Sequence, residues 1–212
     1  MNDQEIDEYF ATARPELVAF LKPFGIFGAA LDIGCASGRL GEDLLQAGIV
    51  RACDGIEVHG EAARLAKSRL RRVWIGSLES VADEVPWPHY DLIVLADVLE
   101  HLVDPWSALR RVHAQTASEC RLLLSVPNVR HYKVLLPLLF RGEFRYTDAG
   151  IMDRTHLHFF TRDSLQEAVH ECGWTVRAIG SHMKRRYRRW YMPTRLLDPF
   201  VAVQTLLLVE KQ

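Results

Sequence analysis

The chain has 212 residues, of which 49% are hydrophobic and 25% are charged, and its formal net charge is −1. This length suits one domain with a full core, so we expect residues 1–212 to form a single domain. The near-zero charge provides no general field that would attract nucleic acid, and we expect no nucleic-acid partner.

Alternating strand and helix patterns fill the first two thirds of the chain. An N-terminal helical segment (1–25) holds an amphipathic helix over 3–21, in which Pro15 marks a break or a new first turn. The predicted strands are 29–33, 52–58, 73–75, 90–95 and 121–126. The predicted helices between them are 39–47, 60–70 and one that Asp104 caps, with Pro105 in its first position. This alternation predicts an α/β fold with a doubly wound, mostly parallel sheet and helices on both faces.

The last third is less regular. A helix over 129–140 precedes a long irregular segment, 141–160, which we interpret as a lid or an acceptor-binding loop because long ordered loops tend to be functional. A helix over 162–172 and two strands, 175–179 and 204–209, complete the pattern.

The four cysteines are widely spaced and contain no C-x-x-C pair. We therefore expect reduced, mostly buried thiols, no zinc cluster and a cytoplasmic protein. The acidic N-terminus has no signal-peptide pattern, and no apolar run is long enough to cross a membrane.

A glycine-rich turn joins the first predicted strand to its helix and predicts a site for a nucleoside-like cofactor. Gly34 and Gly38 allow the backbone to approach a ligand closely. The turn follows the carboxyl end of a strand, where open α/β sheets bind ligands, and Glu57 stands about 20 residues on, where it can accept hydrogen bonds from ribose hydroxyls. Dinucleotide sites have a glycine at the position of Ala36, so this spacing argues against a nicotinamide-dependent oxidoreductase, which remains an alternative.

The segment Leu31-Asp32-Ile33-Gly34-Cys35-Ala36-Ser37-Gly38 resembles the first motif of class I methyltransferases that use S-adenosylmethionine. Ala96-Asp97-Val98-Leu99-Glu100-His101 is similar to the fourth segment of that family. Asp153-Arg154-Thr155-His156-Leu157-His158-Phe159-Phe160-Thr161 is similar to small bacterial enzymes of the ubiquinone O-methyltransferase type and to saccharide or secondary-metabolite methyltransferases. The resemblance implies a seven-stranded sheet whose last strand is antiparallel, S-adenosylmethionine as cofactor and S-adenosylhomocysteine as product.

The resemblance also implies which residues hold the cofactor. Glu57 binds the ribose, Val58 packs on the adenine, and Ser77 stands where the family often has an aspartate that reaches the adenine amino group. The backbone of Leu78 can assist, and Arg14 can pair with the methionyl carboxylate. The other expected cofactor contacts lie at the ends of the first and fourth strands: Asp32, Gly34, Cys35, Ala36, Gly38, Ala96 and Asp97. Asp32 and Asp97 have structural capping as an alternative role.

Histidines provide the candidate catalytic groups. His101 is either a general base or a residue that orients the loop through a backbone hydrogen bond, and His156 is a candidate base or acceptor contact. His156 and His158 share one face of an extended segment, so a metal pair is conceivable. The sequence shows no third ligand, and we expect no metal site.

These features predict methyl transfer to a small-molecule or saccharide acceptor, with a hydroxyl favoured because histidines stand near the site. N- or C-methylation and cofactor binding without turnover are the alternatives. The basic and aromatic run 184–191 is a solvated face or a contact for an anionic acceptor or a lipid surface.

Overall fold

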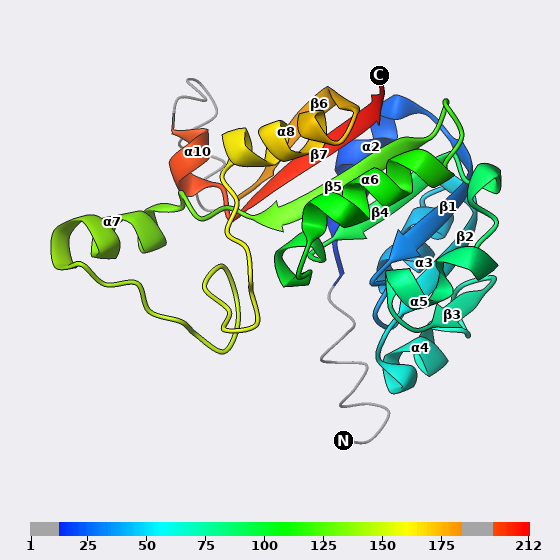
Figure 1. Cartoon of the computed structure of the whole chain (residues 1–212), viewed down its shortest axis with the longest axis horizontal. Helices are drawn as coiled ribbons and strands as arrows, with labels where there is room; N and C mark the ends of the chain where they lie inside the picture. The colour runs from blue at the N-terminus through cyan, green and yellow to red at the C-terminus, as the bar shows by residue number, and fades with distance from the viewer. Residues whose placement is uncertain (1–12, 184–196) are drawn as a thin grey trace.

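The protein is described by a computed structural model over residues 13–183 and 197–212, and its centre is one twisted seven-stranded sheet (Figure 1). The strand order is β3-β2-β1-β4-β5-β7-β6. The strands are β1 (Phe27–Ile33), β2 (Val50–Glu57), β3 (Val73–Ile75), β4 (Leu92–Ala96), β5 (Arg121–Pro127), β6 (Trp174–His182) and β7 (Gln204–Lys211). Neighbouring strands are parallel except where β7 pairs with β5 and with β6, so the predicted fold class and antiparallel last strand are confirmed.

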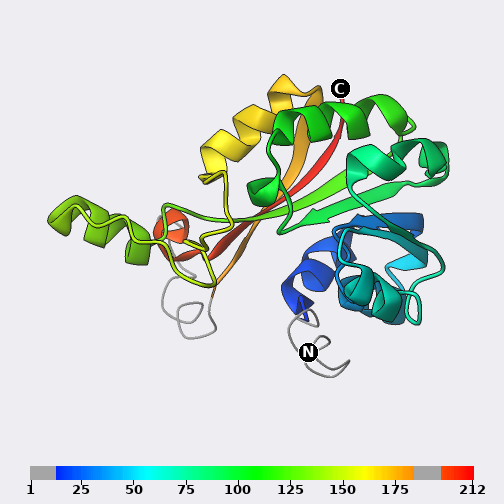
Figure 2. The same cartoon turned by 60° about the horizontal axis from the view of Figure 1, so that its bottom comes forward.

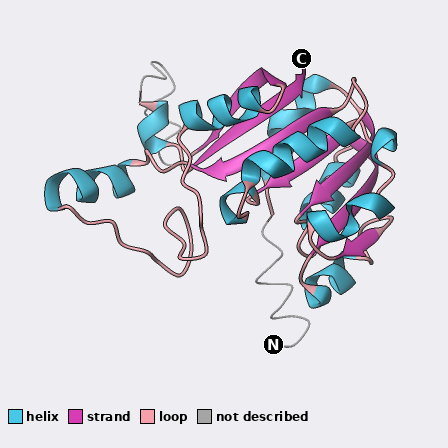
Figure 3. Ribbon diagram, in the orientation of Figure 1, coloured by secondary structure: helices cyan, strands magenta, loops and turns pink. Residues whose placement is uncertain are grey.

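Helices cover both faces of the sheet, as Figure 3 shows. One face carries α2 (Pro15–Leu21), α3 (Arg39–Gln46) and α4 (Gly60–Ala66). The opposite face carries α5 (Leu78–Val81), α6 (Pro105–Gln115) and α8 (Arg162–Glu171). The remaining helical segments are α7 (Tyr132–Arg141), α10 (Asp198–Val201), and the 3-10 turns η1 (Lys22–Phe24), η2 (Ala82–Glu84), η3 (Trp87–His89) and η4 (Leu99–His101).

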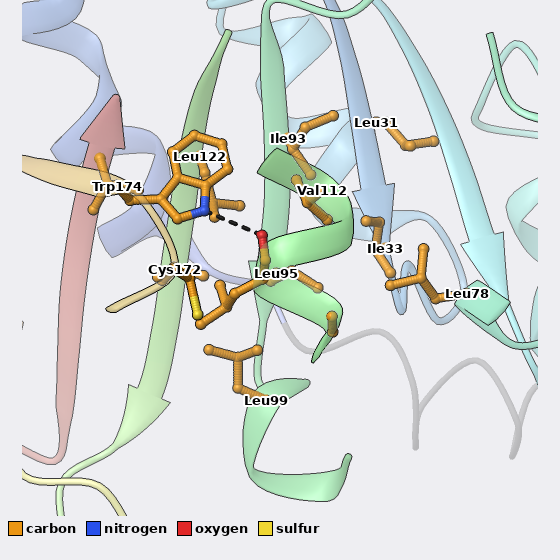
Figure 4. Packing of buried hydrophobic residues seen from close by; sticks show 14 of the residues in the cluster. Leu31, Ile33, Leu78, Ile93, Leu95, Leu99, Val112, Leu122, Cys172 and Trp174 are labelled. Carbon is orange, nitrogen blue, oxygen red and sulfur yellow. Dashed lines mark hydrogen bonds between the residues drawn. The ribbon is translucent and has the colours of Figure 1, made fainter. Parts of the chain in front are cut away.

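Successive residues of each central strand enter opposite cores because side chains alternate across a sheet. In β4, Ile93 and Leu95 belong to the core under α6, whereas Leu92 and Val94 belong to the core under α3. Trp174, fully buried, closes the first core, and its indole N–H donates to the Leu109 carbonyl at 3.2 Å (Figure 4). Each fully buried side chain of this size contributes about 2 kcal/mol of hydrophobic stabilisation.

Local sequence signals set several helix ends. Asp104 accepts a hydrogen bond from the Ser107 amide at 2.9 Å, and Pro105 occupies the first helical turn, as predicted. Thr161 and Ser164 form a reciprocal capping box at the start of α8. The predicted helix over 129–140 instead begins at Tyr132, because residues 128–131 form a turn in which Asn128 accepts from the Arg130 amide.

Other predictions differ from the structure mainly in extent. The predicted helix over 60–70 ends at Ala66, and the predicted N-terminal helix is observed as Pro15–Leu21, with Pro15 in its first turn. Residues 1–12 and the basic run 184–191 lie outside the described residues. The cysteines are free and buried, as predicted. Over the described parts of the chain, no helix has the length and hydrophobicity needed to cross a membrane.

The carboxyl ends of β1, β2, β4 and β5 meet at one edge of the sheet, together with the start of the antiparallel β7. From that edge α7 and the irregular segment after it extend away from the body of the molecule (Figures 1 and 2). The segment then returns to the sheet, where Phe160 pairs with Asn128. This return brings residues 151–160 next to the end of β4.

Candidate active site

The backbone conformation and the close packing of the turn after β1 require its two glycines. Gly34 and Gly38 have φ values of +73° and +80°, which favour glycine. A Cβ on Gly34 would lie 2.6 Å from a methyl of Val98, and one on Gly38 would lie 3.1 Å from the Cα of Ala66. The turn is therefore held close to the loop after β4 and to α4, with no room for side chains at these two positions.

Ala36, in the middle of this turn, is a non-glycine residue with a φ of +48°. The left-handed conformation raises the free energy of a non-glycine residue by about 1 kcal/mol. Backbone strain of this kind is often found at ligand-binding sites. Its N–H donates to Oε2 of Glu57 at 2.7 Å. The turn is thus tied directly to the acidic residue at the end of β2.

Glu57 is 5% exposed and has the hydrogen-bond acceptors that ribose hydroxyls require. Its Oε2 accepts from Ala36, and its Oε1 accepts from the His59 amide at 2.8 Å. A carboxylate has about four lone-pair positions, so each oxygen keeps capacity for one more donor. Two adjacent acceptors suit two adjacent hydroxyls. The neighbouring Val58 side chain is 59% exposed, which leaves an apolar surface for an adenine ring.

Asp32 and Cys35 are both buried. Burial, together with nearby Glu57, raises the pKa of Asp32 to about 7, and burial raises the pKa of the Cys35 thiol. One predicted role of Asp32 is to accept hydrogen bonds from the amides of the turn. Two of these amides have another acceptor, because Gly34 and Cys35 both donate to the Ile56 carbonyl, at 2.8 and 3.1 Å. Asp32 is therefore a buried acid at the edge of β1 and not the cap of these amides.

Ser77 and Leu78 follow β3 at the same edge. Ser77 caps α5, and its Oγ accepts from the Ser80 amide at 3.3 Å. The Leu78 side chain is buried in the core. The capping bond orients the Ser77 hydroxyl, and its contact with adenine stays a prediction.

Asp97 follows Ala96, the half-buried last residue of β4, and has a φ of +57°. Its carboxylate forms an ion pair with Arg14 and accepts from Nε2 of Gln204 at 2.6 Å. Arg14 also donates to Ser125 at 2.8 Å and to Gln204 at 2.7 Å. This network joins α2, β4, β5 and β7.

The network defines the contacts of the Arg14 and Asp97 side chains. The Arg14 guanidinium, predicted to pair with a methionyl carboxylate, lies against Asp97. Asp97 was offered as a helix cap, but η4 has no side-chain cap. Both side chains lie at the edge where the methionyl group is expected, so a role in cofactor binding stays a prediction for each.

The two candidate bases are brought together although they are far apart in the chain. The ring centroids of His101 and His156 lie 4.8 Å apart. Nδ1 of His101 lies 3.3 Å from the Thr155 carbonyl, and Nδ1 of His156 lies 3.1 Å from the Ile151 carbonyl. Burial lowers the pKa of His156, so its ring is neutral near pH 7. His158 does not join the pair, since its Nε2 contacts the Val103 carbonyl at 3.3 Å.

Glu100 is the residue of this site that the sequence analysis missed. It is 1% exposed, and its side-chain oxygens have no hydrogen-bond partner among the described residues. Burial, reinforced by the charge of Asp97, raises the pKa of Glu100 to about 8. The available signal was an acidic residue directly after the apolar pair Val98-Leu99 and next to His101.

A cavity of about 560 Å³ lies between α7 and the segment after it. Its lining is mostly apolar and includes Val134, Phe144 and Met152, with Lys133 and Arg145 as basic groups. Ile151 also lines it, and the same residue's carbonyl binds His156. The cavity therefore adjoins the segment that carries the second histidine.

The family model described as a methyltransferase domain matches residues 5–179. The chain belongs to this methyltransferase family. It is 29% identical over 171 residues to a ubiquinone biosynthesis O-methyltransferase of Pseudomonas paraeruginosa, a match that covers 73% of this chain and 71% of that protein. It is 33% identical over 122 residues to the enzyme of the same name in Pseudomonas aeruginosa, which covers 54% of this chain and half of that protein's length, 50%.

The fold is also that of solved methyltransferases. The crystal structure of a SAM-dependent methyltransferase from Archaeoglobus fulgidus superposes with a TM-score of 0.66 at 16% identity, over 97% of this chain and 97% of that chain. The predicted class I methyltransferase and its cofactor, S-adenosylmethionine, are confirmed. The methyltransferase assignment displaces the alternative of a nicotinamide-dependent oxidoreductase.

Proposed function

We propose that this methyltransferase transfers a methyl group to a hydroxyl of a small-molecule acceptor. One observation carries the choice of oxygen: two imidazoles converge beside the end of β4, each with Nδ1 close to a main-chain carbonyl. An alcohol acceptor has a proton to lose, whereas the sulfonium of S-adenosylmethionine already provides an activated methyl group when bound. The ubiquinone O-methyltransferases that the chain resembles support the same choice.

We propose that the cofactor is held along the carboxyl edge of the sheet. Glu57 accepts from the ribose hydroxyls and Val58 supports the adenine, for the reasons of geometry and exposure given above. The full proposed set is Arg14, Asp32, Gly34, Cys35, Ala36, Gly38, Glu57, Val58, Ser77, Leu78, Ala96 and Asp97. Fixing both reactants at this edge provides much of the acceleration, because in-line displacement depends on orientation.

The proposed proton acceptors are the Nε2 atoms of His101 and His156. A carbonyl oxygen can only accept, so the Nδ1 that contacts it carries the hydrogen. Nε2 of each ring is then free of hydrogen and able to take the acceptor's proton. The rings are oriented by main-chain contacts to Thr155 and Ile151, both in the segment that we interpret as an acceptor-binding loop.

We infer that the acceptor occupies the cavity beside α7. Its apolar lining favours a phenol or another largely apolar ring over a saccharide. Lys133 and Arg145 give it two basic groups for an acceptor that carries an anionic substituent. The irregular segment forms one wall of this cavity and so serves acceptor binding.

A panel of phenols, saccharides and amines incubated with the protein and S-adenosylmethionine tests the proposal. We expect S-adenosylhomocysteine to form with at least one hydroxyl acceptor and not with its methyl ether. Transfer to amines alone would show that the enzyme methylates nitrogen and not oxygen. Tight binding of S-adenosylhomocysteine with no transfer to any acceptor would favour a protein that binds the cofactor without turnover.

A further inference from the structure

Gln204 is the first residue of β7, and the antiparallel direction of that strand places it at the carboxyl edge of the sheet. It lies opposite Pro127, the last residue of β5, and opposite His182, the last residue of β6. A parallel strand in the same place would bring its own last residue to this edge. The sheet therefore adds a side chain from near the end of the chain to the edge where β1, β2 and β4 end.

The side-chain amide of Gln204 bridges two opposite charges. Its Oε1 accepts from Arg14 at 2.7 Å, and its Nε2 donates to Oδ1 of Asp97 at 2.6 Å. The two bonds determine which way the amide points, because a guanidinium only donates and a carboxylate only accepts. Hydrogen bonds to ionised groups are also stronger than those between neutral groups. The amide is therefore held in one orientation between the two charged side chains.

The end of β5 anchors the same two charged residues. Ser125 is fully buried, and its hydroxyl accepts from Arg14 at 2.8 Å. The Ser125 carbonyl accepts from the Asp97 amide at 2.9 Å. The Arg14 side chain is 11% exposed, whereas the Asp97 side chain is 35% exposed. The network is therefore anchored on the side of the sheet and open to solvent at Asp97, where a ligand can reach it.

The charges of this network complement those of the methionyl end of the methyl donor. A methionyl group carries one ammonium and one carboxylate, and the network presents one carboxylate, Asp97, and one guanidinium, Arg14. These two side chains form an ion pair with each other in the structure. Arg14 also pairs with Glu16, so two carboxylates face one guanidinium. The excess of negative charge at this edge suits the ammonium and the sulfonium of the donor.

We propose that Gln204 is a positioning residue for the methyl donor, which holds Arg14 and Asp97 ready for the two charges of the methionyl group. This inference rests on the proposed function, in which the cofactor lies along this edge. When the ion pair between Arg14 and Asp97 opens to admit the methionyl group, each side chain keeps its own bond to the Gln204 amide. Less ordering then remains to be done on binding, and such preorganisation raises affinity.

Isothermal titration calorimetry of the full chain with two ligands tests this role. S-adenosylhomocysteine has the amino-acid group, whereas 5′-methylthioadenosine has the nucleoside and the sulfur without it. In Gln204→Met, affinity for S-adenosylhomocysteine should fall at least about 10-fold, because two hydrogen bonds to charged groups are lost. Affinity for 5′-methylthioadenosine should stay within about 2-fold of wild type, which also shows that the variant is folded.

The matched control is Gln115→Met, the same change at an exposed position in the last turn of α6, and it should bind both ligands as the wild type does. A loss of equal size for both ligands in Gln204→Met would show a merely structural role and overturn the proposal. Unchanged affinity for S-adenosylhomocysteine in Gln204→Met would overturn it as well.

A double-mutant cycle tests whether Gln204 acts through Arg14. Arg14→Ala alone should lower affinity for S-adenosylhomocysteine and spare 5′-methylthioadenosine. In the Arg14→Ala background, Gln204→Met should lower the first affinity by no more than about 3-fold, because residues that act through one another have non-additive effects. Fully additive losses would overturn the proposal.

Glu57→Ala separates the failure of this inference from that of the proposed cofactor site. Loss of both affinities in Glu57→Ala, with neither changed in Gln204→Met, would leave the cofactor site in place and overturn the role of Gln204. Equal affinity of the wild type for the two ligands would overturn both this inference and the proposed position of the methionyl group. Calorimetry needs no acceptor, so the proposed transfer to a hydroxyl is tested separately.

Discussion

The two sides of the active-site edge are built from very different spans of the chain. On the cofactor side, the contact that ties the turn to the acid joins Ala36 and Glu57, which are 21 residues apart. On the acceptor side, His101 meets Thr155 across 54 residues, and the Glu100 carbonyl accepts from the Leu157 amide. One strand-turn-helix-strand unit provides the predicted ribose contact, whereas the turn after β4 and the returning segment 151–160 form the second side.

The difference in span has a physical consequence. A unit closed over about 20 residues brings its groups together at a small entropic cost. The conformation of its turn depends on residues that are adjacent in the sequence. The acceptor side depends on the return of the segment after α7 and on β7 lying between β5 and β6. We therefore expect changes on the two sides to affect separate properties, namely cofactor affinity and methyl transfer.

The largest effect is expected for His156→Ala on the acceptor side. The rate of methyl transfer should fall about 100-fold or more, because the change removes a proposed proton acceptor. Affinity for S-adenosylhomocysteine should stay within about 2-fold of wild type, since His156 is not among the proposed cofactor contacts. Measuring both in one preparation shows whether the two sides are separable. Equal loss of affinity and rate would refute the separation.

The opposite pattern is expected for Glu57→Ala on the cofactor side. Affinity for S-adenosylhomocysteine, measured by calorimetry, should fall about 10- to 100-fold, since each hydrogen bond to a charged group contributes about 1.5–3 kcal/mol. Glu119→Gln, a change at an exposed position in the turn before β5, is the control. Unchanged affinity for S-adenosylhomocysteine would contradict the assignment of Glu57 as the ribose-binding residue.

Asp32→Asn is expected to change how stability depends on pH. Burial and Glu57 raise the pKa of Asp32 to about 7, with Arg14 opposing and the Cys35 and Cys53 thiols facing it. The native state therefore holds a proton that the unfolded chain releases above about pH 4, so stability falls as pH rises to about 7, by up to about 1.4 kcal/mol per unit from this group. Urea unfolding at pH 5 and pH 7.5 should show a smaller difference in Asp32→Asn. A difference as large as in wild type would contradict the raised pKa.

The smallest effect is expected for Ala36→Gly. Glycine adopts a φ of +48° without steric cost, so the change should raise the free energy of unfolding by about 1 kcal/mol, less the extra entropy of the unfolded chain. Ala36→Val should lower it, because a β-branched residue fits this conformation poorly. Thermal unfolding of the two variants gives the signs. Destabilisation by glycine of more than about 1 kcal/mol, which exceeds the entropic effect, would show that the turn is not strained.

Adjacent residues determined much of the fold and the cofactor side. The apolar runs, the caps at Asp104 and Thr161, and the glycines of the turn specify local structure through short-range sterics and hydrogen bonds. The pairing of Gly34, Gly38 and Glu57 at one edge follows from the parallel sheet that this pattern predicts.

Tertiary structure alone decided the acceptor side. No local pattern places β7 between β5 and β6 or brings the ring of His101 against that of His156. The sequence supplied Glu100, His101 and His156 as residue types, but contacts across more than 50 residues depend on how the whole chain packs. Local propensities act over a few residues, and only the assembled sheet and its returning loop bring such distant groups within reach of one ligand.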